Sequence, residues 1–102
     1  MPVTVMVEFQ MKPEATEQFR ADLPQALEAT RARDGNQSIE VLHNQDDPCN
    51  IVVFQRWDSR APYESYLQWR LDTGMMEMME PIVAKEPSIR FWDTGPGPAD
   101  PA

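Results

Sequence analysis

The chain has 102 residues, of which 17 are acidic and 9 are Lys or Arg, so its net charge at pH 7 is −8. Apolar residues make up 41%, which is typical of one soluble globular domain and excludes long disordered segments except at the C-terminus. A protein this acidic repels phosphate backbones and anionic lipid, so we expect neither a nucleic-acid partner nor a membrane partner.

Cysteine and histidine occur once each, as Cys49 and His43. A single cysteine forms no intrachain disulfide and no CxxC motif, which suits a reducing, cytoplasmic location. A single histidine excludes sites that use two or three His ligands, and most zinc chemistry needs such a site. We therefore expect no metal site.

The N-terminal third has the pattern of a strand followed by a helix. Residues 3–11 place an apolar side chain at every odd position, which predicts a half-buried β-strand. Lys12 and Pro13 end this strand, and apolar residues then recur at helical spacing up to the stop signal Asp34-Gly35. Pro24 lies inside that pattern and is expected to kink the helix, because it has no backbone N–H to donate.

Two further strands are expected in the middle of the chain. Residues 38–44 alternate in polarity and predict a strand with His43 near its end. Residues 45–48 form a turn cluster. Residues 51–57 begin with four apolar side chains in a row, as a central strand covered on both faces does.

The C-terminal part is expected to hold a second helical region and one strand. Asp58 or Ser59 can cap the second helix. The methionine-rich residues 75–83 predict a short further helical piece that ends near Glu86-Pro87, and residues 88–92 predict the last strand.

The expected elements follow the order β-α-β-β-α-β, which is the ferredoxin-like α+β pattern with a four-stranded antiparallel sheet. We expect one domain over residues 1–93 and a disordered Pro/Gly tail over residues 94–102. The helices of this fold cover one face of the sheet. Because the strands keep apolar residues on both faces, we expect a homodimer in which two sheets face each other as a dimeric α/β barrel.

A set of motifs along residues 3–93 resembles the antibiotic biosynthesis monooxygenase family. The motifs are Glu40-Val-Leu-His43, then Asp46-Asp47-Pro48, then Val52-Val-Phe-Gln-Arg-Trp57-Asp-Ser, followed by Tyr63. Members of this family are small dimeric α/β-barrel proteins. They include oxygenases that act on polyketide quinols without a cofactor.

The resemblance implies three catalytic residues. In the cofactor-independent polyketide monooxygenases, a His on the second strand, a Trp at the end of the third and a Tyr six residues later line the pocket. His43, Trp57 and Tyr63 hold those places, His43 as base or orienter, Trp57 as stacking wall and Tyr63 as polar anchor. The implied reaction uses O₂, no cofactor, and an electron-rich quinol, phenol or anthrone-like aromatic substrate.

Four more residues are expected to bind the substrate. Tyr66 and Arg70 share one helix face with Tyr63, and the Arg70 guanidinium can hold an anionic or carbonyl group. Val53 and Phe54 lie on the preceding strand.

Each of these residues also has a structural interpretation, in the core or on a solvated face. Two departures from the polyketide monooxygenases support a different function: Val53 stands where those enzymes have Asn, and Glu77 where they have Arg. The alternative is a dimeric small-molecule binding protein, or an isomerase, on the same fold.

Overall fold

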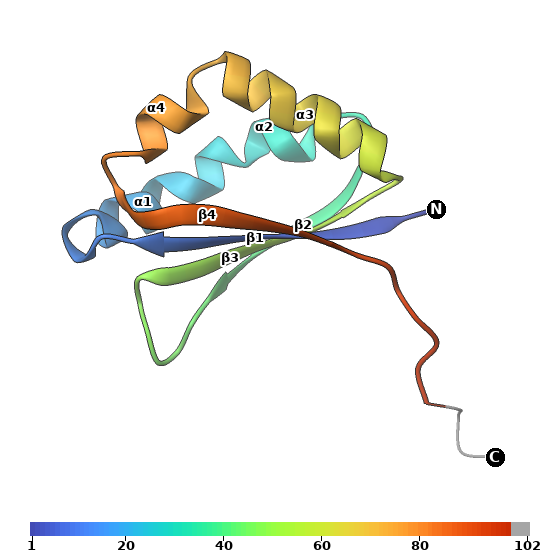
Figure 1. Ribbon diagram of the computed structural model, residues 1–102, viewed down its shortest axis with the longest axis horizontal. Coiled ribbons are helices and arrows are strands. Elements are labelled where there is room, and N and C mark those ends of the chain that lie inside the picture. Colours follow the sequence, from blue (N-terminus) through green and yellow to red (C-terminus); the bar gives the residue numbers. More distant parts are fainter. Residues whose placement is uncertain (99–102) are drawn as a thin grey trace.

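The computed structural model describes residues 1–98 and shows a four-stranded antiparallel sheet with every helix of that range on one face (Figure 1). The strands are β1 (Val3–Met11), β2 (Asn36–His43), β3 (Asn50–Trp57) and β4 (Val83–Trp92), in the order β2-β3-β1-β4. The helices are α1 (Pro13–Ala26), α2 (Glu28–Arg31), α3 (Arg60–Asp72) and α4 (Met75–Met79). This arrangement confirms the ferredoxin-like α+β fold.

The core lies between the sheet and the helices. Alternate residues of the two central strands point into it, and Val7 of β1 pairs with Val53 of β3 in the middle of the sheet. The sequence alternation therefore predicts the inward face of β1 correctly, because successive side chains of a strand point to opposite faces.

The first helix is divided in two, as the proline predicts. Pro24 lies inside α1, and Leu27 separates the end of α1 from the single turn of α2. Pro24 has no N–H to donate to the carbonyl of Arg20, which weakens the helix just before the division. The helical direction is kept, since the Leu27 N–H bonds to the Leu23 carbonyl at 3.0 Å.

Three local expectations need correction. The methionine helix ends at Met79, and β4 already begins at Val83, so Glu86-Pro87 lies within a strand. Pro87 is tolerated because β4 is an edge strand and because the β1–β4 register shifts between Ser88 and Lys85, where Pro87 lies. Ser59 occupies the N-cap position of α3, but neither it nor Asp58 caps the helix through its side chain.

The predicted tail is described only in its first part. Residues 93–98 have no regular secondary structure and are exposed, whereas residues 99–102 lie outside the described residues. Within residues 1–98, no helix combines the length and the apolar character needed to cross a membrane.

Gly35, between α2 and β2, should be among the least replaceable residues of the fold. Its φ is +95°, and a Cβ added there would lie 2.6 Å from Cβ of Pro62. We expect Gly35→Ala to lower the free energy of unfolding by about 3 kcal/mol, which combines left-handed backbone strain with overpacking. Gly74 is the matched control, because its φ is +94° and a Cβ added there would meet only the flexible end of the Glu77 side chain, at 3.7 Å. Gly74→Ala should cost about 1 kcal/mol, and equal losses in urea unfolding would contradict the role of the Pro62 contact.

Candidate functional site

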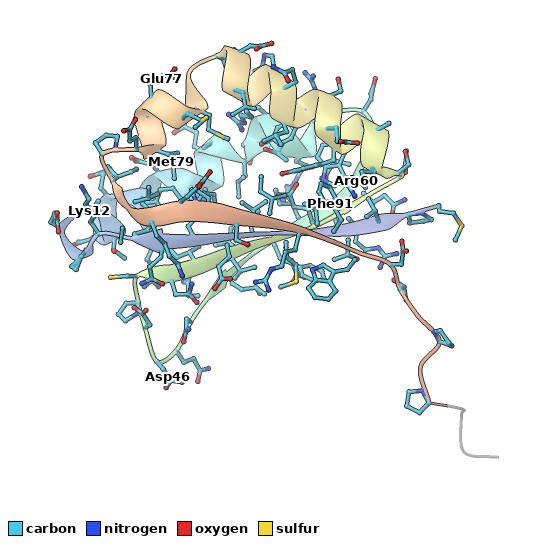
Figure 2. The ribbon with its side chains drawn as sticks, in the orientation of Figure 1. Lys12, Asp46, Arg60, Glu77, Met79 and Phe91 are labelled. Carbon is cyan, nitrogen blue, oxygen red and sulfur yellow. The ribbon has the colours of Figure 1, made fainter. Side chains whose placement is uncertain are left out.

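Three of the expected site residues form a closed aromatic cluster between the sheet and α3. The Trp57 ring lies 5.5 Å from that of Tyr63 and 5.4 Å from that of Tyr66, between centroids. Trp57 is 0% exposed, and both tyrosines are buried. Phe91 of β4 extends the cluster, with its ring 5.6 Å from Tyr63, and carries the Arg60 guanidinium over its outer side (Figure 2). Trp57, Tyr63 and Tyr66 are thus part of the hydrophobic core, and Phe91 packs against them.

The polar atoms of Trp57 and Tyr66 are already engaged inside the protein. The indole N–H of Trp57 donates to Oε1 of Gln55 at 2.8 Å. The Tyr66 hydroxyl lies 2.6 Å from Oγ1 of Thr30, which is fully buried. In this structure, neither the Trp57 indole N–H nor the Tyr66 hydroxyl is therefore free to bind a substrate.

Arg70 joins the helices instead of facing an open pocket. Its Nε donates to the Tyr66 hydroxyl at 2.8 Å, and its Nη2 donates to the Ala26 carbonyl at 2.7 Å and to Thr30 Oγ1 at 3.2 Å. Ala26 is the last residue of α1, so Arg70 satisfies a carbonyl that the end of that helix leaves free. All these acceptors are neutral oxygens.

Burial of the Tyr63 hydroxyl raises its pKa above the ordinary value near 10, and Tyr66 adds to the rise. A tyrosine kept neutral in this way is a hydrogen-bond donor at neutral pH. The unfolded chain ionises this tyrosine near pH 10, whereas the folded protein does so only at higher pH. The contribution of the neutral Tyr63 to the free energy of unfolding is therefore complete below pH 10 and is lost as the pH rises toward the raised pKa. We expect Tyr63→Phe to lose less unfolding free energy than wild type between pH 9 and 11 in urea titrations. Parallel losses in the two proteins would contradict this.

His43 lies at the opposite end of the sheet from the aromatic cluster. On β3, His43 pairs with Ile51, whereas Trp57 pairs with Asn36. Ile51 and Trp57 are six positions apart on the strand, which corresponds to about 20 Å. In Figure 2, Asp46 marks the β2–β3 turn beyond His43, and Phe91 and Arg60 mark the cluster end. The structure therefore does not bring His43 together with Trp57 and Tyr63.

The partner of His43 is Arg20 of α1, whose Nη2 lies 2.7 Å from Nδ1 of the imidazole. Arginine has only donors, so Nδ1 of His43 accepts and the ring proton lies on Nε2. In this geometry, the exposed His43 presents an N–H donor beside a fixed cation. The pair can stabilise an oxyanion, which supports orientation by His43 in preference to base catalysis.

A groove of about 240 Å³ with a mixed apolar and charged lining runs beside this pair, between β2 and the end of α1 with α2. Ile39 and Val41 form its floor, and Pro24 and Leu27 form one wall. His43 follows Val41 on the same strand face, and Arg20 precedes Pro24 by one helical turn, so the pair stands at one end of the groove.

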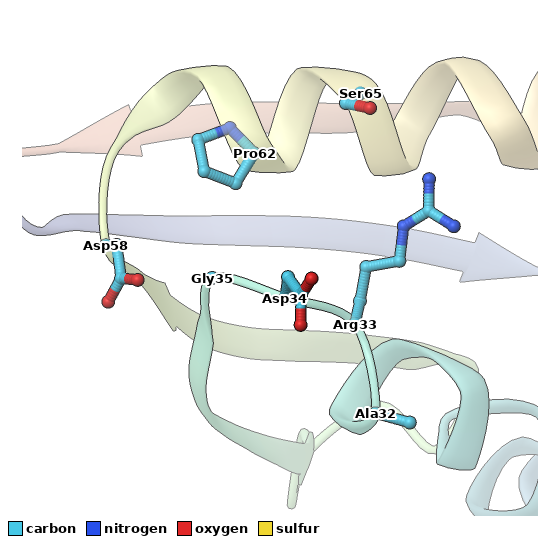
Figure 3. Close-up of a pocket in the computed structure, with 7 residues that line it drawn as sticks. All are labelled: Ala32, Arg33, Asp34, Gly35, Asp58, Pro62 and Ser65. Atoms are coloured by element: carbon cyan, nitrogen blue, oxygen red, sulfur yellow. The ribbon is translucent and has the colours of Figure 1, made fainter.

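A second, more open depression of about 610 Å³ lies on the other side of α2 (Figure 3). Arg33, Asp34 and Gly35 line it from the segment after α2, and Pro62 and Ser65 line it from α3. Trp57 lies directly beneath, since a Cβ on Gly35 would contact its ring at 3.6 Å. The groove thus borders α2 itself, and the depression borders the segment that directly follows α2.

The remaining two predicted residues lie on opposite faces of the sheet. Val53 is buried beneath the helices, and Phe54 points to the uncovered face opposite Met6 of β1. Phe54 therefore cannot line a pocket with Val53 within one protomer, because adjacent strand residues face opposite ways.

Three residues of these sites were not singled out as functional from the sequence: Arg20, Thr30 and Gln55. Gln55 was detectable in principle, since the alternation of β3 places it on the buried face. Arg20 and Thr30 carry no such signal, because their roles depend on which strand and helix lie opposite. Among residues 1–98, no group of three or more His, Cys, Asp or Glu side chains could hold a metal ion.

The chain is a ferredoxin-like domain with two hollows on the face of the sheet that the helices cover. Residues 2–70 match the family model described as antibiotic biosynthesis monooxygenase. The chain is also 33% identical over 79 residues to the Mycobacterium tuberculosis protein Rv0793, which carries the name of an inferred monooxygenase; the match covers 72% of this chain and 77% of that protein. The chain belongs to the antibiotic biosynthesis monooxygenase family.

Solved structures support the same fold. A crystal structure of an antibiotic biosynthesis monooxygenase has a TM-score of 0.80 at 19% identity and covers 92% of this chain and 99% of its own. A conserved protein of Methanosarcina mazei has a TM-score of 0.81 at 16% identity, over 93% of this chain and 94% of its own. The structure of Rv0793 has a TM-score of 0.72 at 24% identity, over 97% and 100% of the two chains.

Proposed function

We propose that this protein is a cofactor-independent monooxygenase that oxidises an electron-rich quinol, phenol or anthrone-like aromatic with O₂ in the groove beside Arg20 and His43. One observation carries the proposal: Arg20 and His43, in contact at 2.7 Å, adjoin along α1 and β2 the residues Pro24 and Val41 that line the groove. Membership of the antibiotic biosynthesis monooxygenase family supports the reaction class.

The groove suits a flat aromatic ring. Leu27, Ile39 and Val41 supply apolar surface, and the volume of about 240 Å³, just below the range of about 300–1,000 Å³ for ligand pockets, suits a substrate of one or two rings. Arg31 stands at the groove as a second cation. Glu28 also lines the groove, so an aromatic alcohol that ionises on binding gains from the positive charges when its oxygen lies at the Arg20–His43 end.

The chemistry begins with loss of the hydroxyl proton to water. The phenolate oxygen accepts from Nε2–H of His43 and is stabilised by the Arg20 charge, as an oxyanion hole stabilises its anion. The electron-rich anion passes one electron to O₂, and the two radicals combine at a ring carbon. The ring carbon then loses its hydrogen as a proton, and the O–O bond of the peroxide breaks. One oxygen remains as a new carbonyl, and the other leaves as hydroxide, which takes up a proton to become water. The protein binds, orients and limits access of water.

A homodimer that packs through the uncovered sheet face is part of the proposal. Figure 1 shows the helices on one face only. The other face exposes Leu42 by 44% and Trp92 by 48%, and the half-buried Met6, Val52 and Phe54 lie with them. Apolar residues gathered in this way are typical of an interface. Solution scattering should give twice the monomer mass, and Leu42→Asp should lower it; a monomeric wild type would contradict this part.

We place the protein in the cytoplasm, since Cys49 is a free thiol.

The test is O₂ uptake in an electrode cell, with chelator-treated protein and a panel of reduced naphthoquinones, phenols and anthrones. Autoxidation is subtracted with buffer and with the His43→Ala protein. Uptake above both controls is expected with at least one bicyclic quinol. Uptake no faster than buffer across the panel would contradict the oxygenase.

One observation favours the binding-protein alternative. Trp57, which the family resemblance marks as catalytic, and Tyr66 and Arg70, which were expected to bind substrate, are hydrogen-bonded inside the protein in this structure. A binding protein would show ligand-dependent melting with the same aromatics and no O₂ uptake.

A further inference from the structure

Helix α2 separates the groove beside His43 from the depression above Trp57. Glu28 and Arg31 of α2 line the groove, and the residues that follow α2, from Ala32 to Gly35, line the depression. The buried Tyr66 lies beneath α2 and touches it through Thr30. Displacement of this single turn would therefore join the two hollows over the aromatic cluster.

The attachment of α2 to the core is polar and small. Thr30 is its one buried residue, and the helix is four residues long. Its bonds across to α3 are those of Thr30 Oγ1 to the Tyr66 hydroxyl at 2.6 Å and to Arg70 Nη2 at 3.2 Å. A segment with so little buried apolar surface belongs to the part of a protein that opens first.

Both ends of α2 can act as hinges. Before it, Pro24 leaves the Arg20 carbonyl without its helical partner, and Leu27 divides α1 from α2. After it, Gly35 has a φ of +95°, a conformation that glycine adopts at little cost.

We infer that α2 is a lid, latched to α3 by Thr30, Tyr66 and Arg70, whose opening extends the groove over Trp57 and admits substrates of three or more fused rings. The choice of substrate rests on the proposed function, whereas the lid itself requires no oxygen chemistry. In the open state, the Tyr66 hydroxyl and the Arg70 guanidinium lose Thr30 and become available to a carbonyl or phenolate oxygen of the substrate.

The first test is native-state hydrogen exchange of the intact protein, comparing wild type with Thr30→Val. The variant keeps the shape of the side chain and removes the latch hydroxyl. We expect the amides of Arg31, Ala32 and Arg33, which bond within α2 and its end, to exchange at least ~tenfold faster. Thr16→Val is the matched control, because Thr16 is also buried and its Oγ1 bonds to the Lys12 carbonyl at 2.9 Å in α1.

Exchange of Arg31–Arg33 that stays unchanged in Thr30→Val, or that rises equally in Thr16→Val or throughout the helical layer, would overturn the lid. Should Thr30→Val not fold, Tyr66→Phe removes the same contact from the other side and carries the same expectation. The readout does not depend on turnover, so a protein without O₂ uptake can still have the lid, and an active oxygenase can lack it.

The second test measures affinity for two redox-inert probes, naphthalene-2-sulfonate and anthraquinone-2-sulfonate. Opening the latch raises the fraction of protein that can accept the longer probe, so its Kd should fall several-fold in Thr30→Val. The Kd of the two-ring probe should stay within about twofold. Equal changes for the two probes, or none, would overturn the extension to larger ring systems.

Discussion

His43→Ala is expected to lower kcat/KM for a bicyclic quinol about 10²-fold, while His43→Gln stays within about tenfold of wild type. Glutamine can accept from Arg20 through its amide oxygen and donate through its amide nitrogen, which reproduces the two hydrogen bonds of the neutral imidazole. Alanine supplies neither. The rates come from initial O₂ uptake with autoxidation subtracted.

The pair of substitutions separates orientation from base catalysis. If His43 removed the substrate proton, His43→Gln would be as inactive as His43→Ala, because an amide takes no proton near neutral pH. Arg20→Met should resemble His43→Ala, since it removes both the fixed cation and the contact that sets the tautomer. Arg60→Met is the matched control: Arg60 lies over Phe91, at the other end of the sheet, and its loss should leave the rate unchanged.

Trp57→Ala should have the largest effect on stability, lowering the free energy of unfolding by about 3–5 kcal/mol. The indole is fully buried, contacts Tyr63 and Tyr66, and donates to Gln55. Its loss leaves a large cavity and an unpaired buried amide. Trp92→Ala is the control in urea unfolding, because Trp92 is 48% exposed and should cost under about 1 kcal/mol. Similar losses at the two positions would contradict the assignment of Trp57 to the core.

The same residue offers a test of where a small substrate binds. Trp57→Phe keeps most of the packing, and below its melting temperature it should oxidise a bicyclic quinol at close to the wild-type rate. A loss as large as that of His43→Ala would instead place the substrate against Trp57.

The fold could be predicted from the sequence because it depends on local patterns. Alternation defines β1 and β3, the Asp34-Gly35 signal ends the first helical region, and the Pro24 interruption appears as the division at Leu27. The errors occur where tertiary context overrides local preference. In the sequence, Pro87 predicts a boundary between two elements. The structure accommodates it within β4 because that strand is at the edge of the sheet.

The candidate site could be predicted only in part. His43, Trp57 and Tyr63 were grouped by family resemblance, but the β2–β3 register separates His43 from the other two by about 20 Å. A register depends on the turn and on burial of one sheet face, so residues near each other in sequence order can lie at opposite sheet ends. Arg20 and Thr30 depend on contacts between distant elements, which no spacing in the chain reveals.

The sole histidine makes the central claim directly measurable. In ¹⁵N NMR, the His43 ring should show a protonated Nε2 and an accepting Nδ1, and its signals should shift when 1,4-dihydroxynaphthalene is added without O₂. The same ligand should leave the ring signals of the Arg20→Met protein nearly unmoved. A proton on Nδ1, or ring signals that stay fixed while the ligand binds, would contradict a substrate site at the Arg20–His43 groove.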